Sequence, residues 1–320
     1  MIPRPAVKIL GLILSIACLA FFAYEAREIF ANQTVSLAGS PVLRAMPIAM
    51  VPFLLAYAML AGAWYCLLRL FGLKTPLPRA LGIYLVTQIA KYLPGNVGHH
   101  IGRIYLASQH GLPAFRVGLS MVSEMFLIVL IALLFSLPLA PLLAQRAGAG
   151  AQGWSVLIYA GTAVAIVASA ALYLLRHHHA VKSVRTHLVT AMREARHGPG
   201  VPFFLGAVAL SAIGLAMAGI SLVALFATTA DLSADVLAKG IALVCVAWIA
   251  GFLTPGAPAG LGVREAILLA GLGSMFDRQT AFEATIMFRG VSVAADLVAF
   301  LCGLLLLRGL RKAQPVTPNP

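Results

Sequence analysis

The sequence IAGFLTPGAPAGLGVRE, residues 249–265, places a proline–glycine pair directly after a run of apolar residues. A second stretch, IAKYLPGNVGHHIGR at residues 89–103, has the same frame apart from one inserted threonine, Thr254. In both stretches an arginine follows the glycine of the pair by eight residues, Arg103 in the first and Arg264 in the second. Proline ends the helical hydrogen-bond ladder, and glycine permits a tight turn. We therefore expect each stretch to interrupt a helix.

The composition is that of a protein buried in a lipid bilayer. Of the 320 residues, 61% are apolar and 10% are charged, and the mean hydropathy is +0.95. Soluble globular domains carry charge on roughly a quarter of their residues. No polar stretch is longer than the segment 176–200, which leaves no room for a separate soluble domain. We therefore expect one integral membrane domain over residues 1–320.

Apolar runs of about 20 residues, the length that crosses a bilayer as a helix, recur along the chain. The uninterrupted runs are residues 7–24, 46–68, 116–137, 155–175, 201–228, 236–253 and 285–307. Two further stretches, 80–109 and 254–276, are apolar but contain the proline–glycine motifs. The sequence thus predicts an all-α fold, a polytopic bundle of transmembrane helices with two broken or re-entrant segments.

The basic residues predict the orientation of the chain in the membrane. The net charge is +13, and lysine and arginine gather in short segments beside the apolar runs, which favours a role in membrane orientation over nucleic-acid binding. The positive-inside rule places both termini and the basic loop 176–200 on the cytoplasmic side. The stretch 80–109 then begins and ends on that side, whereas 254–276 is reached from the outer side. Two matching motifs of opposite orientation predict an inverted-topology repeat, with repeat 1 at about 80–137 and repeat 2 at about 236–307.

The two motifs are expected to line an internal cavity, because non-helical backbone at membrane depth needs cover from protein or water. Short helices at 97–108 and 261–274 would begin in that cavity, and their free N–H groups and positive dipole ends attract anions. Arg103 and Arg264 add cationic charge that suits bidentate binding of a phosphate. The candidate substrate-binding residues are Arg103, Arg264, Lys91, Pro94, Gly95, Asn96, Glu124, Pro255, Gly256, Gly260, Gly262 and Glu265.

Ionisable residues inside apolar runs are costly unless they are paired or face water, so each is a functional candidate. Beside the arginines of the motifs they include Glu124, Glu265, Arg289 and Asp296. An alternative is that these arginines and acids form internal ion pairs that only hold the bundle together. Lys91 is equally compatible with a functional role and with a side chain that extends to the membrane interface.

The histidines do not predict a metal site. His99 and His100 stand beside Asn96 without further ligands at a suitable spacing, which favours hydrogen bonding or an interfacial position. The histidines at 177–179 belong to the basic loop and are expected to face solvent and lipid headgroups. We therefore expect neither a metal nor a cofactor.

The second motif, PGAPAGLGVRE at 255–265, and the first, from Lys91 to Arg103, resemble the flippase-like membrane domain of lysylphosphatidylglycerol synthases and their stand-alone relatives. The similarity spans roughly residues 46–307. His99 and His100 stand where that family's pattern leads us to expect glycine or glycine–glutamate. In the family the membrane domain is implicated in moving lipid, whereas aminoacyl transfer belongs to a separate soluble domain. The resemblance thus implies a bacterial inner-membrane protein without synthase activity.

The sequence favours a lipid translocator, which is not an enzyme, in which an anionic headgroup enters the cavity between the two motifs. Anionic membrane lipids are the expected partners, and the oligomeric state is left open. One alternative is an accessory subunit that binds a lipid- or glycan-synthesis enzyme through the loop 176–200. Another is an intramembrane enzyme that modifies lipids with Glu124 and either Glu265 or Asp296 as an acid–base pair.

Overall fold

The structure is a computed structural model that describes residues 41–92, 98–139, 200–227, 233–254 and 258–312. All regular elements in these ranges are helical, and none of them is a strand. The α-helices are α2 (Pro41–Leu70), α3 (Leu77–Thr87), α4 (Gly98–Gln109), α5 (Ala114–Phe135), α9 (Gly200–Ala224), α10 (Ala234–Leu253), α11 (Val263–Leu272) and α12 (Arg278–Lys312). Three short 3₁₀ segments accompany them: η1 (Gln88–Tyr92), η2 (Leu137–Leu139) and η3 (Pro258–Gly260).

Five of the predicted membrane spans are confirmed as helices. Helices α2, α5, α9, α10 and α12 are long and apolar enough to cross a bilayer, α5 together with the following η2. The predicted spans 7–24 and 155–175 lie outside the described residues, as does the basic loop at 176–199. The chain is therefore an integral membrane protein whose described residues are all-α and include five candidate spans.

Helices α3, α4 and α11 are too short to cross a bilayer. They have 11, 12 and 10 residues, or at most about 18 Å at a rise of about 1.5 Å per residue, against a hydrocarbon core of about 30 Å. Two of them, α4 and α11, follow the two proline–glycine pairs. Each pair is therefore followed by a helix that ends before it could span the membrane.

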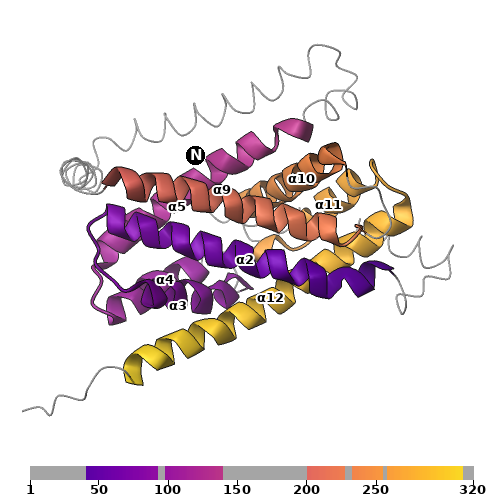
Figure 1. The fold of residues 1–320 in the computed structure, drawn as a ribbon. Coiled ribbons are helices and arrows are strands. Elements are labelled where there is room, and N and C mark those ends of the chain that lie inside the picture. The colour runs from indigo at the N-terminus through magenta and orange to yellow at the C-terminus, as the bar shows by residue number, and fades with distance from the viewer. Residues whose placement is uncertain (1–40, 93–97, 140–199, 228–232, 255–257, 313–320) are drawn as a thin grey trace, which may run out of the picture.

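Helices α2 and α9 lie side by side along much of their length (Figure 1). Small residues permit the close approach: a Cβ on Gly214 would lie 2.9 Å from the Leu60 side chain. The Ser221 hydroxyl donates a hydrogen bond of 2.7 Å to the carbonyl of Ala49. Packing of small residues is the usual means by which helices associate in lipid, where burial of apolar surface between helices gives little driving force.

Helix α12 extends along the whole molecule and contacts α2, α3, η1, α9 and α11 (Figure 1). Its start is capped by Asp277, whose carboxylate accepts the backbone N–H of Thr280 at 3.0 Å, and hydrogen bonds from Thr280 hold the pKa of this carboxyl below its usual range. Near its other end Gly303 meets α3, where an added Cβ would lie 2.8 Å from the backbone nitrogen of Val86. One helix thus packs against elements of both halves of the described chain.

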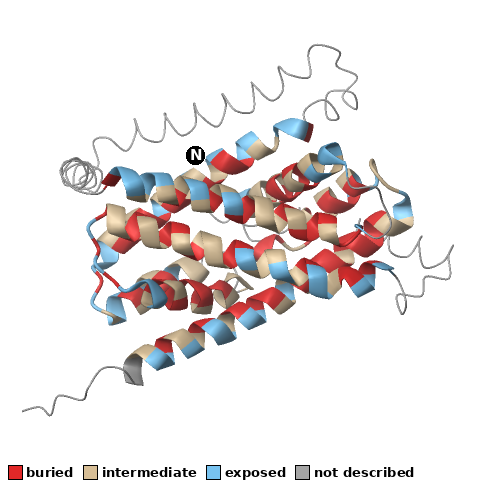
Figure 2. Cartoon of the chain, in the orientation of Figure 1, coloured by how far each residue is buried: buried red, intermediate tan, exposed pale blue. Residues whose placement is uncertain are grey.

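The outward faces of the bundle are apolar. Leu205 on α9 and Leu301 and Leu305 on α12 are more than half exposed, and Figure 2 shows exposed residues along the outer sides of both helices. Polar side chains show the opposite distribution, since Arg103, Glu124 and Asp296 are almost fully buried. This inversion is expected when the solvent around the protein is lipid.

Candidate functional site

The described segments next to the two proline–glycine pairs contact each other. Segment η1, just before the Pro94–Gly95 pair, contacts η3, just after the Pro255–Gly256 pair, although the two segments are more than 160 residues apart. The turn residues themselves, Pro94, Gly95, Asn96, Pro255 and Gly256, lie outside the described residues.

Beyond the second break the backbone turns through the left-handed region. Ala259, Gly260 and Gly262 have φ values of +52°, +70° and +83°. Glycine adopts this region at no steric cost, whereas a non-glycine residue held there carries about 1–3 kcal/mol of strain. The N–H of Gly262 donates to the Glu265 carboxylate at 2.7 Å, which caps the first turn of α11. Gly260 and Gly262 therefore set the path on which α11 begins.

A cavity of about 180 Å³ lies between helices from both halves of the described chain. Residues of α2, α3, η1, α4, α5, α9, α10, α11 and α12 line it. About 10–15 Å³ of such volume admits one water molecule, so the cavity has room for several waters or for a small polar headgroup. Its charged lining residues are Lys91, Arg103, Glu124, Arg264, Glu265 and Arg289. The sequence pointed to seven charged candidates. Six of them line this cavity, and the seventh, Asp296, is not among the lining residues.

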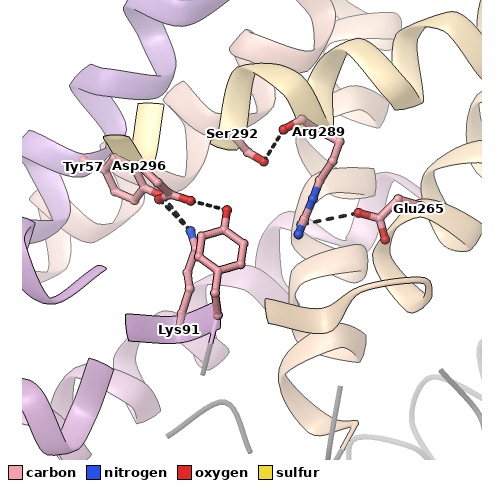
Figure 3. Close-up of polar contacts among 7 residues, drawn as sticks. Tyr57, Lys91, Glu265, Arg289, Ser292 and Asp296 are labelled. Carbon is pink, nitrogen blue, oxygen red and sulfur yellow. Dashed lines mark hydrogen bonds and ion pairs between the residues drawn. The ribbon is translucent and has the colours of Figure 1, made fainter. Parts of the chain in front are cut away.

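Asp296 on α12 is the centre of one polar cluster beside this cavity. It accepts the Lys91 ammonium at 2.7 Å, the Tyr92 hydroxyl at 2.6 Å and the hydroxyl of Tyr57 on α2 (Figure 3). The Lys91 ammonium also donates to the Tyr57 oxygen at 2.9 Å. Asp296 is 1% exposed, so these groups replace its hydration. The cluster fastens η1 to α2 and α12.

Glu265, in the first turn of α11, forms a second polar cluster. One carboxylate oxygen caps α11, and the other lies 3.4 Å from Nη1 of Arg289 on α12 (Figure 3). The Ser292 hydroxyl donates to the Arg289 carbonyl at 2.8 Å. Thr285, Arg289, Ser292 and Asp296 follow one another at intervals of three or four residues, which puts them on one face of α12.

Arg103 and Glu124 form the third cluster, where α4 packs against α5. Their side chains join at 2.6 Å and are almost fully buried. The guanidinium also lies over the rings of Tyr84 and Trp64, with centroid distances of 4.1 and 5.1 Å. Arg103 therefore already has a carboxylate partner, as the ion-pair alternative proposed.

Arg264 differs from the other cationic residues of the cavity. Its side chain passes over Gly251 and Gly260, where an added Cβ on either glycine would lie 2.7 Å from it. No carboxylate of the described chain lies within 4.0 Å of its guanidinium, and its Nε is buried without a hydrogen-bond partner. Two glycines thus make room for a cation that forms no ion pair with a described carboxylate.

Counted over the part of the chain that the structure describes, the charged groups at the cavity have one positive charge in excess. Lys91, Arg103 and Arg289 each pair with one carboxylate, and Arg264 is the fourth basic residue of the lining. With Asp296, which lies beside the cavity and pairs with Lys91, these four cations face three carboxylates. An anion that carries one negative charge would balance this arrangement.

His99 and His100 line the same cavity, with ring centroids 3.8 Å apart. The Nδ1 atom of His99 is buried without a hydrogen-bond partner. Within the described ranges no group of three histidine, cysteine, aspartate or glutamate side chains is arranged to hold a metal. The pair thus adds hydrogen-bonding capacity next to the charged groups.

The sequence did not single out the aromatic partners of these clusters. Tyr57, Tyr84, Tyr92 and Trp64 occur in or near apolar runs, where aromatic residues are ordinary packing residues. A signal exists for Tyr57, because its hydroxyl lies within a predicted span and a buried hydroxyl needs a partner.

Comparison with curated proteins gives no match for this chain. A family model described as the lysylphosphatidylglycerol synthase TM region matches residues 8–299, which is most of the chain. The match includes both motifs, all three polar clusters and Arg264. The chain therefore belongs to the lysylphosphatidylglycerol synthase TM region family.

Proposed function

We propose that this protein moves lipids with an anionic headgroup across the bilayer and catalyses no covalent step. The observation that carries the proposal is Arg264, a cation without an ion-pair partner among the described residues, in a cavity between two interrupted helices. Family membership links the chain to membrane lipids. A phosphate bound at Arg264 would offset a charge that is costly to keep unpaired inside the membrane.

The separation of charged cavity and apolar surface supports the same function. The headgroup would occupy the cavity, where polar side chains replace its hydration. The acyl chains would remain in lipid along the apolar outer faces of the bundle (Figure 2). A translocator needs this division, because the main cost of moving a lipid is taking its charged headgroup through hydrocarbon.

Alternating access would come from the inverted repeat and the two re-entrant segments, which are part of this proposal. The contact between η1 and η3 supports it, as do the positions of α3 and α4 toward one end of the bundle and α11 toward the other (Figure 1). Rocking of one repeat against the other would then open the cavity to each side in turn. We further propose cytoplasmic termini and a bacterial inner membrane, the location that the family resemblance implies.

The carboxylates argue against the alternative of an intramembrane enzyme. General acid–base chemistry needs a carboxyl group that is free to exchange a proton with the substrate. Glu124, Glu265 and Asp296 each pair with a basic residue in the structure. Their arrangement suits fixed charge compensation better than proton transfer.

The test is translocation of fluorescent phosphatidylglycerol by the purified protein in liposomes. A membrane-impermeant reductant bleaches outer-leaflet label, so protein-dependent loss of the protected inner-leaflet signal reports movement. We expect movement with the wild type and a loss of at least about tenfold in rate with Arg264→Gln, because that substitution removes the unpaired cation.

Lys239→Gln is the matched control, since it removes a lysine from a surface pair with Asp235 outside the cavity. It should retain the wild-type rate. Equal rates for wild type and a folded Arg264→Gln variant would contradict the role of Arg264. If the wild type moves no lipid, the translocator proposal is wrong and a search for a lipid- or glycan-synthesis partner becomes the next experiment.

A further inference from the structure

We infer that the cavity selects lipids whose headgroup carries a phosphate and no ammonium group, so that aminoacylated lipids bind more weakly than their unmodified parents. This inference rests on the proposed function, since it specifies which lipid the same cavity takes. Its basis is the pairing of the charged side chains: among the described residues Arg264 has no ion-pair partner, whereas each carboxylate at the cavity is paired with a basic residue.

The carboxylates have little capacity for an incoming ammonium group. Both oxygens of Asp296 accept hydrogen bonds from the protein, and both oxygens of Glu265 are engaged by the α11 backbone and Arg289. Glu124 binds Arg103 through one oxygen, and its other oxygen is buried without a partner. At Asp296 or Glu265 an ammonium group would therefore have to displace a basic residue, and at Glu124 it would find one free oxygen on a carboxylate whose charge is already paired with Arg103.

The cationic side is open to a ligand at Arg264 and Arg289. Both residues line the cavity, from α11 and α12, and carry the same charge. The Arg289–Glu265 contact of 3.4 Å is the longest of the three ion pairs at the cavity, the others being 2.6 and 2.7 Å. A phosphate between the two arginines would offset these charges and could use both guanidinium groups.

Charge balance gives an order of preference. A headgroup with one negative charge neutralises the excess positive charge of the cavity. A zwitterionic headgroup leaves that excess unchanged. Lysylphosphatidylglycerol, the lipid in the family's name, has more ammonium than phosphate charge and would raise it. We therefore expect the order anionic, zwitterionic, aminoacylated, from the tightest binding to the weakest.

Binding can be measured separately from transport. Trp248 lines the cavity, so its fluorescence should respond to headgroup binding in detergent micelles, and Trp248→Phe should abolish that response. The probes are dihexanoyl phosphatidylglycerol, farnesyl phosphate, dihexanoyl phosphatidylethanolamine and the lysyl ester of the first lipid. The first two probes each carry one phosphate, but one is a phospholipid and the other is a prenyl phosphate. Their relative affinity shows which of these two lipid classes the cavity binds more tightly.

We expect the lysyl ester to bind at least about tenfold more weakly than its parent lipid. A tenfold ratio of affinities requires only a modest difference in electrostatic free energy. Equal or tighter binding of the lysyl ester would overturn the inference, as would no saturable binding of any probe. Selective binding without movement in liposomes would uphold the inference and refute the translocator proposal, so the two failures are distinguishable.

Charge substitutions at Arg264 test the cause of the selectivity. Arg264→Gln should bring the affinities of parent lipid and lysyl ester closer together, and Arg264→Glu should reverse their order. If the glutamate variant does not fold, the glutamine variant carries the test. Lys239→Gln should keep the wild-type preference. An unchanged preference in folded Arg264→Gln would overturn the inference.

Discussion

Replacing Asp296 by asparagine should destabilise the protein more than any loss of hydrogen bonds can explain. The substitution removes the carboxylate that holds the Lys91 ammonium at 2.7 Å and accepts the hydroxyls of Tyr57 and Tyr92. Hydrogen bonds between membrane helices average about 0.6 kcal/mol, so three of them account for about 2 kcal/mol. Leaving a buried ion without its partner costs about 3–5 kcal/mol, so the charge term should dominate.

A double variant separates the two contributions. Lys91→Met together with Asp296→Asn removes both charges, and its cost should return to the hydrogen-bond scale of about 2 kcal/mol. Stability can be measured by titrating sodium dodecyl sulfate into dodecylmaltoside micelles and following far-ultraviolet circular dichroism. Asp235→Asn, which breaks the surface pair with Lys239, is the control and should cost less than about 1 kcal/mol. If Asp296→Asn alone costs no more than the double variant, the argument from the unpaired lysine is wrong.

Three further predictions can be checked by the same titration. Glu124→Gln should cost about 3–5 kcal/mol because Arg103 loses its buried partner, and a cost below about 1 kcal/mol would contradict that pairing. Gly303→Ala should cost about 1–3 kcal/mol of stability because its Cβ would meet the α3 backbone. Gly309→Ala, with open space around residue 309, should be neutral or stabilising. Equal stability of the two variants would refute the packing argument. Ser233→Ala should cost about 1 kcal/mol because α10 loses its N-cap hydrogen bond, and an unchanged midpoint would refute this.

The spanning helices could be predicted because lipid makes apolar length a direct signal. The ends of these helices could not be predicted, because a helix continues beyond the hydrocarbon region where the polar residues that follow still form helix. Thus α2 begins at Pro41, ahead of the apolar run at 46–68, and α12 extends beyond the run 285–307 on both sides. The breaks were visible because proline and glycine act through the local backbone, which the sequence reports directly.

The charged residues of the site could be nominated from the sequence, but their pairing could not. Lys91 and Asp296 are 205 residues apart, so their contact depends on how α12 packs against η1. Arg103 and Arg264 occupy equivalent motif positions and yet differ: α5 presents Glu124 to the first, whereas Glu265 is engaged by Arg289 and the α11 backbone. A pattern repeated in sequence does not repeat the neighbours that decide a residue's charge environment.

The polar face of α12 determines how far a headgroup would travel between favourable contacts. Thr285 and Ser292, the outer two of the three polar residues of this face that line the cavity, are seven residues apart, which corresponds to about 10 Å along the helix axis. This is about a third of the roughly 30 Å that separates the two headgroup regions. Within that third, Arg289 divides the path into steps of four and three residues, or about 6 and 4.5 Å. A charged group moving beside α12 would therefore exchange one polar contact for the next in short steps instead of crossing the hydrocarbon in a single long one.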